Sequence, residues 1–143
     1  MEILATKEIL KEVAEAADKD DVFIKGSAET PEIVLNSSEG EIKFSGRSMP
    51  EDAKAFYQPL KEWIQKYAES PAPGTRVVFG YEYFNTSSSK MIMELIEEVK
   101  KIEEKDSQLR LEWHYLEDDD DMLEAGEDYE DILDVNFEFV SFE

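Results

Sequence analysis

The residues whose types could do chemistry gather at one junction in the chain. The stretch "YEYFNTSSSKMIMEL" changes from an alternating aromatic pattern to an apolar helical pattern, and five polar residues separate the two: Asn85, Thr86, Ser87, Ser88 and Ser89. A helix start leaves about four backbone N–H groups unpaired, and together with the helix dipole these groups favour an anion. The junction therefore suits either a helix cap or a phosphorylated hydroxyl.

These two explanations differ in how many polar residues they require. Asn, Ser and Thr all cap helices well, but a cap needs only one such residue. A phosphate on Thr86 would carry about −1.5 to −2 charge, meet the N–H groups of the helix start and lie one helical turn from Lys90. Both hypotheses stay open: Thr86 is the acceptor of a phospho-switch, or it is only a helix cap.

The sequence holds none of the common catalytic constellations. Its glycines are scattered singly, which excludes a phosphate-binding loop, and it has no G-x-S-x-G elbow. A Ser-His-acid triad would have to use His114, the single histidine, which stands between Trp113 and Tyr115 as a solvent-side strand residue would. No cysteine is present, so disulfides and thiolate sites are excluded. We expect no enzymatic activity, no cofactor and no metal.

A long acidic run, "EDDDDMLEAGEDYEDILD", extends from Glu117 to Asp134. It does not fit a calcium-binding loop, because that spacing would need acidic residues where Leu123 and Ala125 stand. The run is a solvated face, a docking surface for a basic protein or a loose cation site. The alternative to a phospho-switch is thus an acidic protein-binding or cation-binding module, with these docking residues: Asp118, Asp119, Asp120 and Asp121.

Composition limits the class of protein and its partners. The chain has 143 residues, enough for one domain, and 41% of them are hydrophobic, which is typical of a globular protein. It has 15 Lys and Arg against 36 Asp and Glu, and the net charge of −21 repels phosphate backbones and anionic headgroups. We therefore expect neither nucleic acid nor membrane as a partner. The chain start lacks the order of a signal peptide, so the expected location is cytoplasmic.

The elements that must position the junction follow from apolar spacing. Period-3.6 patterns predict helices over residues 3–17, 53–67, 90–102 and 122–133. Alternating patterns predict strands over residues 22–26, 33–35, 41–45, 75–85, 109–117 and 135–143, the second and third forming a hairpin. Ser48, Pro50 and Glu51 fit a capped start of the second helix. The strand at 75–85 looks covered on both faces. This alternation predicts an α/β fold with helices packed on a mixed sheet, and an extra helix in front.

Three stretches together are similar to a known family. The segment "EYFNTSSSK", with "SGRSMPEDAKAFYQPLKEW" upstream and "WHYLEDDDDMLEAGEDYED" downstream, resembles the SiaC-family regulatory phosphoproteins of bacteria. The likeness begins at Val22, which divides the chain into an N-terminal helical extension, residues 1–21, and a SiaC/STAS-like domain, residues 22–143. More distantly, the layout resembles the STAS domains of anti-sigma factor antagonists, in which an Asp-Ser-Ser-Gly turn is phosphorylated. Here Asn85-Thr86 replaces Asp-Ser and Ser88 takes the Gly position, which favours the SiaC group.

The resemblance implies a function as well as a STAS-like mixed sheet. It makes Thr86 the phosphoacceptor and gives the surrounding residues the task of shaping the turn: Asn85, Ser87, Ser88, Ser89 and Lys90. A dedicated protein kinase would modify Thr86, and a PP2C-type phosphatase would restore it. The unmodified form would bind and regulate a diguanylate cyclase in biofilm and c-di-GMP signalling. The expectation is a non-enzymatic signalling adaptor that switches partners on reversible phosphorylation.

Overall fold

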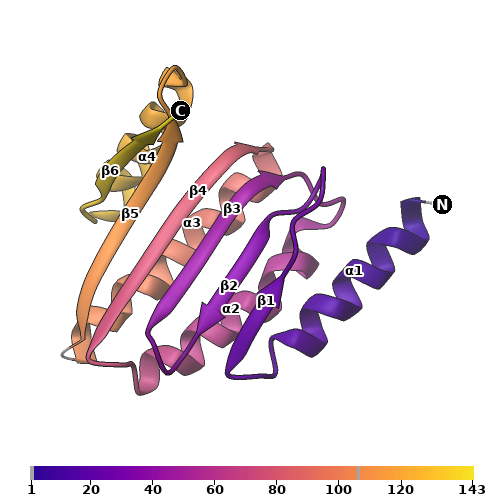
Figure 1. Ribbon diagram of the computed structural model, residues 1–143, viewed down its shortest axis with the longest axis horizontal. Helices are drawn as coiled ribbons and strands as arrows, with labels where there is room; N and C mark the ends of the chain where they lie inside the picture. The colour runs from indigo at the N-terminus through magenta and orange to yellow at the C-terminus, as the bar shows by residue number, and fades with distance from the viewer. Residues whose placement is uncertain (1, 106) are drawn as a thin grey trace.

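A single mixed sheet organises the molecule (Figure 1). The computed structural model describes residues 2–105 and 107–143, with side chains from residue 8 onward. The sheet follows chain order, and its strands are β1 (Asp21–Ile24), β2 (Glu32–Asn36), β3 (Glu41–Ser48), β4 (Gly74–Phe84), β5 (Gln108–Leu116) and β6 (Glu138–Phe142). β1, β2 and β3 pair antiparallel, whereas β3 to β6 run parallel. The predicted mixed sheet is confirmed.

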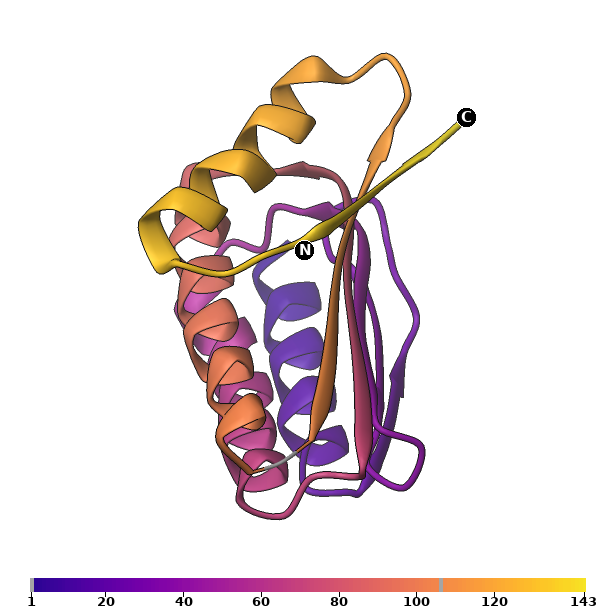
Figure 2. The ribbon, with the colours of Figure 1, turned by 90° about the vertical axis from the view of Figure 1, so that its left-hand side faces the viewer.

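The helices all lie on one face of this sheet (Figure 2). They are α1 (Glu2–Ala16), α2 (Ala53–Glu69), α3 (Thr86–Lys100), the 3-10 helix η1 (Lys101–Lys105) and α4 (Asp120–Leu133). α2, α3 and α4 are the crossovers that parallel neighbours require, and α1 is the predicted extra helix, in contact with α2 and β1. None of the helices in the described ranges has the length and apolar character needed to cross a membrane.

The core between helices and sheet comes from the periodicities of the sequence. Ile33 of β2, Phe44 of β3 and Phe79 of β4 each lie at a position where strand alternation points the side chain toward the helices. All three are fully buried. Phe56 and Leu60 lie four residues apart on α2 and are fully buried against them. The apolar stripe of each helix thus meets the apolar face of the sheet.

The predicted capped start of α2 is wrong. Asp52 caps this helix, because its carboxylate accepts a hydrogen bond of 3.0 Å from the backbone N–H of Ala55. Ser48 instead ends β3, where it pairs with Phe84 of β4 and is fully buried. The strand continues three residues beyond its predicted end at Ser45, which carries Ser48 inward.

Both faces of β4 are covered along its centre, as the sequence predicts, because residues 77–81 are buried one after another. Val77, Phe79 and Tyr81 face the helices, whereas Val78 and Gly80 face the opposite side, where no helix of the described residues lies (Figure 2). Val78 is nevertheless only 1% exposed. Burial of an apolar side chain on this face of β4 therefore does not require a second layer of helices.

α4 lies unusually close to the sheet. A Cβ at Gly126 would come within 2.7 Å of Cδ1 of Trp113 and 2.8 Å of Cε1 of Phe139, so only glycine fits at this contact. The indole N–H of Trp113 donates a hydrogen bond of 2.9 Å to the carbonyl of Met122, which ties the first turn of α4 to β5. The acidic helix is thus a fixed part of the fold.

Candidate functional site

The junction singled out by the sequence is the start of α3. Thr86 is the first residue of this helix and is separated from the end of β4 only by Asn85, at the carboxyl edge of the parallel strands. Asn85 is the N-cap, since its side-chain oxygen accepts a hydrogen bond of 2.9 Å from the N–H of Ser88. The backbone N–H of Asn85 donates to the carbonyl of Ser48 at 3.1 Å. Capping therefore belongs to Asn85, while Thr86 and Ser87 are exposed.

Ser88 turns inward and belongs to a chain of buried hydroxyl groups. Its Oγ accepts from Oγ of Ser48 at 2.9 Å and donates to the Ser48 carbonyl at 3.1 Å. The Ser48 hydroxyl lies 2.6 Å from that of Tyr57 on α2, which lies 3.0 Å from the hydroxyl of Tyr81 on β4. Each of these four side chains is at most 1% exposed. The start of α3 is therefore tied to β3, to α2 and to β4.

The direction of these hydrogen bonds follows because each hydroxyl group has only one hydrogen to donate. The Ser48 hydroxyl gives its single hydrogen to Ser88, so Tyr57 must donate to Ser48 and Tyr81 to Tyr57. Burial raises the pKa of Tyr57 to about 12 and raises the pKa of Tyr81 well above its usual 10. Both phenols therefore stay protonated at physiological pH, and every donor in the chain is kept.

Ser89 connects the junction to the acidic helix. The Tyr129 hydroxyl of α4 donates to the Ser89 carbonyl at 2.8 Å, and the Ser89 hydroxyl, 2.9 Å away, donates to Tyr129 in return. Tyr129 is 6% exposed, and burial raises the pKa of its phenol. α3 and α4 are thus joined at the turn that holds Thr86.

Cationic side chains lie close to this turn in the sequence and on the neighbouring strands. Lys90 is exposed, one helical turn after Thr86. Arg47, near the end of β3, is paired with Tyr83 in the sheet and holds its guanidinium carbon 5.4 Å from the centre of that ring. Lys90, four residues after Thr86 on α3, is therefore the cation that helix geometry places on the same side as Thr86.

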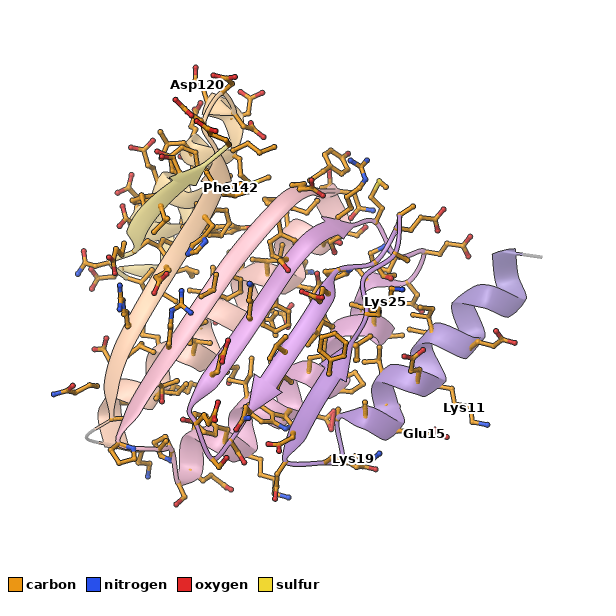
Figure 3. All side chains as sticks on the ribbon, viewed as in Figure 1. Lys11, Glu15, Lys19, Lys25, Asp120 and Phe142 are labelled. Carbon is orange, nitrogen blue, oxygen red and sulfur yellow. The ribbon has the colours of Figure 1, made fainter. Side chains whose placement is uncertain are left out.

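The acidic residues predicted for docking have two different roles. Asp118, Asp120 and Asp121 are exposed, and Asp120 lies at an outer tip of the molecule (Figure 3). Asp119 instead caps α4, because its carboxylate accepts a hydrogen bond of 3.0 Å from the N–H of Met122. Within the described residues, no group of three or more His, Asp or Glu side chains is arranged to hold a metal ion.

Four residues that shape the site carry no local sequence signal for this role: Ser48, Tyr57, Tyr81 and Tyr129. Ser48 lies 40 residues from Ser88, and its only sequence signal, a serine three residues before a glutamate, favoured a helix cap. Tyr57, Tyr81 and Tyr129 each fit an apolar core position, and their spacing carries no sign of the hydroxyl's partner. Only the strand register brings these groups together.

The family is decided by the extent of the match to a family model. The model of the SiaC family regulatory phosphoproteins matches residues 24–142. The chain belongs to the SiaC family. An uncharacterised protein of Pseudomonas aeruginosa is 24% identical over 119 residues, which cover 83% of this chain and 93% of that protein. α1 lies ahead of the matched region.

Solved structures share the fold. SiaC of Pseudomonas aeruginosa superposes with a TM-score of 0.74 at 22% identity, covering 87% of this chain and all of that one. A chain in the crystal structure of the diguanylate cyclase SiaD in complex with its activator SiaC, from the same organism, gives a TM-score of 0.74 at 23% identity, covering 85% and 98% of the two chains. The fold built here around Thr86 is therefore the SiaC fold.

Proposed function

We propose that this chain is a non-enzymatic signalling adaptor that switches partners when Thr86 is reversibly phosphorylated. The observation that supports this most is the exposed hydroxyl of Thr86 on a helix start that Asn85 already caps. An exposed threonine can be reached by a kinase, and capping does not account for its presence. The chain also belongs to a family of regulatory phosphoproteins.

The neighbouring hydroxyl groups are poorer acceptors for physical reasons. Ser88 is fully buried and engaged with Ser48, so a kinase would have to open the core to reach it. Ser89 is engaged with Tyr129. Ser87 is exposed beside Thr86 and therefore provides the matched control.

A phosphate on Thr86 would act at an interface and leave the fold intact. It would face the free N–H groups of the first turn of α3 and lie one turn from Lys90, so the isolated protein tolerates the added charge. A partner that packs on the unmodified hydroxyl would have to bury a poorly paired phosphate. That burial costs several kcal/mol, and each 1.4 kcal/mol is about tenfold in affinity.

The proposed partners are a protein kinase, a PP2C-type phosphatase and a diguanylate cyclase bound by the unmodified form. The cyclase is supported by the structural relative SiaC, which is the activator of the cyclase SiaD in the complex described above. In this proposal the protein itself does no chemistry, since the residues around Thr86 position a turn and donate hydrogen bonds.

The test compares phosphorylated with unphosphorylated protein. The diguanylate cyclase of the native host is titrated with both forms, and with Thr86→Ala and Ser87→Ala after treatment with the kinase. Phosphorylation should weaken binding by about tenfold or more. Thr86→Ala should keep the affinity of the unmodified form and gain no phosphate, whereas Ser87→Ala should respond like the parent. Equal dissociation constants for the two forms would contradict the proposal.

The exposed carboxylates of the α4 segment favour a second candidate function. Asp118, Asp120 and Asp121 stand in solvent on a chain of net charge −21. Such a surface attracts a basic protein at low salt and loses that partner as salt rises. In this alternative the Glu117–Asp134 segment is the binding module, and Thr86 has no switching role.

A further inference from the structure

The face of the sheet opposite the helices, here called the open face, consists of alternate residues of all six strands (Figures 2 and 3). Four large hydrophobic side chains are clearly exposed in the described part of the chain, and three of them stand on this face: Phe23, Tyr83 and Phe142. The register places Phe23 beside Val34 at one edge and Phe142 beside Leu116 at the other. The open face is therefore not the uniformly charged surface expected of so acidic a chain.

Part of the charge on the open face is neutralised by ion pairs centred on Glu112. Glu112 is only 2% exposed and accepts hydrogen bonds from Arg76 at 2.7 and 3.0 Å. It also lies 3.1 Å from Nε of Arg110 and 2.8 Å from Nε2 of His114, and Arg110 reaches Glu138 at 3.0 Å. The hydrogen bonds from Arg76 hold the pKa of Glu112 down at about 2. The ion pairs of Glu112 with Arg76 and Arg110 therefore persist at physiological pH.

The ion pairs on the open face limit the kind of protein that can bind there. Two chains of charge −21 repel each other wherever their acidic surfaces meet, so a second copy can approach closely only on a face whose charges are already paired. A strongly basic partner would instead be drawn to the exposed carboxylates around α4. The open face thus fits a second copy better than it fits a basic protein.

The strand register makes the open face complementary to itself. In the sheet Glu41 lies beside Arg76 and Arg47 beside Tyr83, in each case β3 beside β4. Consider a two-fold axis that runs parallel to the strands, between β3 and β4 and midway between two facing sheets. This axis places β3 of each copy opposite β4 of the other. It sets Glu41 of one copy opposite Arg76 of the other, and Arg47 opposite Tyr83. Opposite charges and cation–π partners therefore meet across the axis.

The centre of the open face allows two sheets to approach. Ser45 and Gly80 lie side by side near this axis, and a Cβ on Gly80 would be 3.8 Å from that of Ser45. The six strands lie about 4.8 Å apart, so the sheet is roughly 25 Å wide. Strand stretches of about seven residues make it roughly 25 Å long as well, so the projected area of the open face is on the order of 600 Å². Standard interfaces bury about 800 Å² per partner, which an undulating surface of this size approaches.

We propose that two copies of this chain pack open face to open face as a two-fold symmetric dimer. The contact is isologous, so each copy supplies the same residues. Phe23 of one copy lies over the β6 edge of the other. The helices and Thr86 remain on the outer surfaces, so the dimer forms independently of the phosphorylation state.

Sedimentation equilibrium on the full chain tests this assembly. The dimer should tighten as NaCl rises from about 50 to 500 mM, because salt screens the repulsion between copies. Phe23→Asp should raise the dimer dissociation constant by about tenfold or more. Ile132→Asp is the matched control: Ile132 of α4 is 66% exposed against 67% for Phe23, and the charge change is equal. A monomeric mass at every salt concentration, or equal effects of the two variants, would overturn the proposal.

Cross-linking locates the contact. The chain has no cysteine, so Ser45→Cys and Ser87→Cys each introduce a single thiol, on the open face and on the helix side respectively. A short bismaleimide should give covalent dimers with Ser45→Cys and not with Ser87→Cys, and the reverse result would overturn the assigned face. Thr86→Ala should dimerise like the parent, which separates the outcome for this proposal from the outcome for the phospho-switch.

Discussion

At the scale of single residues, the polar cluster at the start of α3 divides its tasks. Asn85 caps the helix, Ser88 anchors it to β3 and Ser89 joins it to α4. Thr86 and Ser87 are left in solvent. Capping requires only one of these polar residues. Ser88 and Ser89 are explained by their tertiary contacts, and Thr86 provides an accessible hydroxyl.

The buried side of this cluster should contribute strongly to stability. Ser88→Ala removes the acceptor of the Ser48 hydroxyl, which is then buried without a partner, at a cost of about 1 to 3 kcal/mol. Ser87→Ala, one residue away and exposed, should change the free energy of unfolding by no more than about 0.5 kcal/mol. Urea unfolding of the two variants measures the difference. Equal stabilities would show that the buried hydroxyl chain does not fix the turn.

How much of the site could be predicted depends on whether its contacts are local. The helix start, the exposure of Thr86 and the proximity of Lys90 follow from the order of residues between Tyr81 and Leu95. The contact of Ser48 with Ser88 depends on the pairing of β3 with β4, which no local pattern specifies. The role of Thr86 as phosphoacceptor stays a prediction, and it rests on family resemblance and accessibility.

At the scale of secondary-structure elements, the acidic segment is more than a charged surface. α4 is fixed to the sheet by Gly126 against Trp113 and to the junction by Tyr129. Its first turn depends on Asp119, one of the four aspartates expected only to dock a partner. Replacing all four together would therefore mix a structural effect with an electrostatic one.

Single substitutions should separate these two effects. Asp119→Ala removes the N-cap of α4 and should cost about 1 kcal/mol of stability. Asp118→Ala removes one of several like charges in solvent and should leave stability unchanged or slightly raised. Thermal or urea unfolding at equal ionic strength checks the pair. A loss of stability for Asp118→Ala as large as for Asp119→Ala would contradict the assignment of the cap.

The elements were predictable where periodicity alone decides them. Helices α2 and α3 and strands β3 to β5 appear where apolar spacing places them, because each buries one face against the other layer. The errors concern ends and caps: β3 continues to Ser48, and α2 is capped by Asp52. The division into an extension, residues 1–21, and a domain, residues 22–143, stays a prediction.

At the scale of the whole molecule, the distribution of charge separates the surfaces. The helix side carries the acidic α4 segment and Thr86, whereas the open face pairs its charges internally through Glu112. The net charge was read directly from the sequence. The balanced open face was not, because strand alternation alone does not show that Arg76, Arg110 and His114 converge on one carboxylate.

The net charge of −21 gives a prediction for the fold as a whole. Raising NaCl from about 0.05 to 0.5 M shortens the Debye length from more than 10 Å to under 5 Å and screens the repulsion among carboxylates. The melting temperature should therefore rise, by a few degrees for each kcal/mol of relieved repulsion. Melting at low micromolar concentration, where dimerisation contributes least, measures this rise.

Divalent ions distinguish general screening from a specific site on the acidic segment. No cluster of three or more metal-binding side chains exists in the described residues, so CaCl₂ and MgCl₂ should act as NaCl does at matched ionic strength. A specific site would instead stabilise the fold by RT ln(1 + [L]/Kd), and the effect would appear at low ion concentration. A rise in melting temperature at sub-millimolar calcium, lost in a variant with Asn at positions 118, 120 and 121, would therefore favour the cation-binding alternative. Asp119 is left intact in that variant because it caps α4, so the loss could not be attributed to unfolding of the helix.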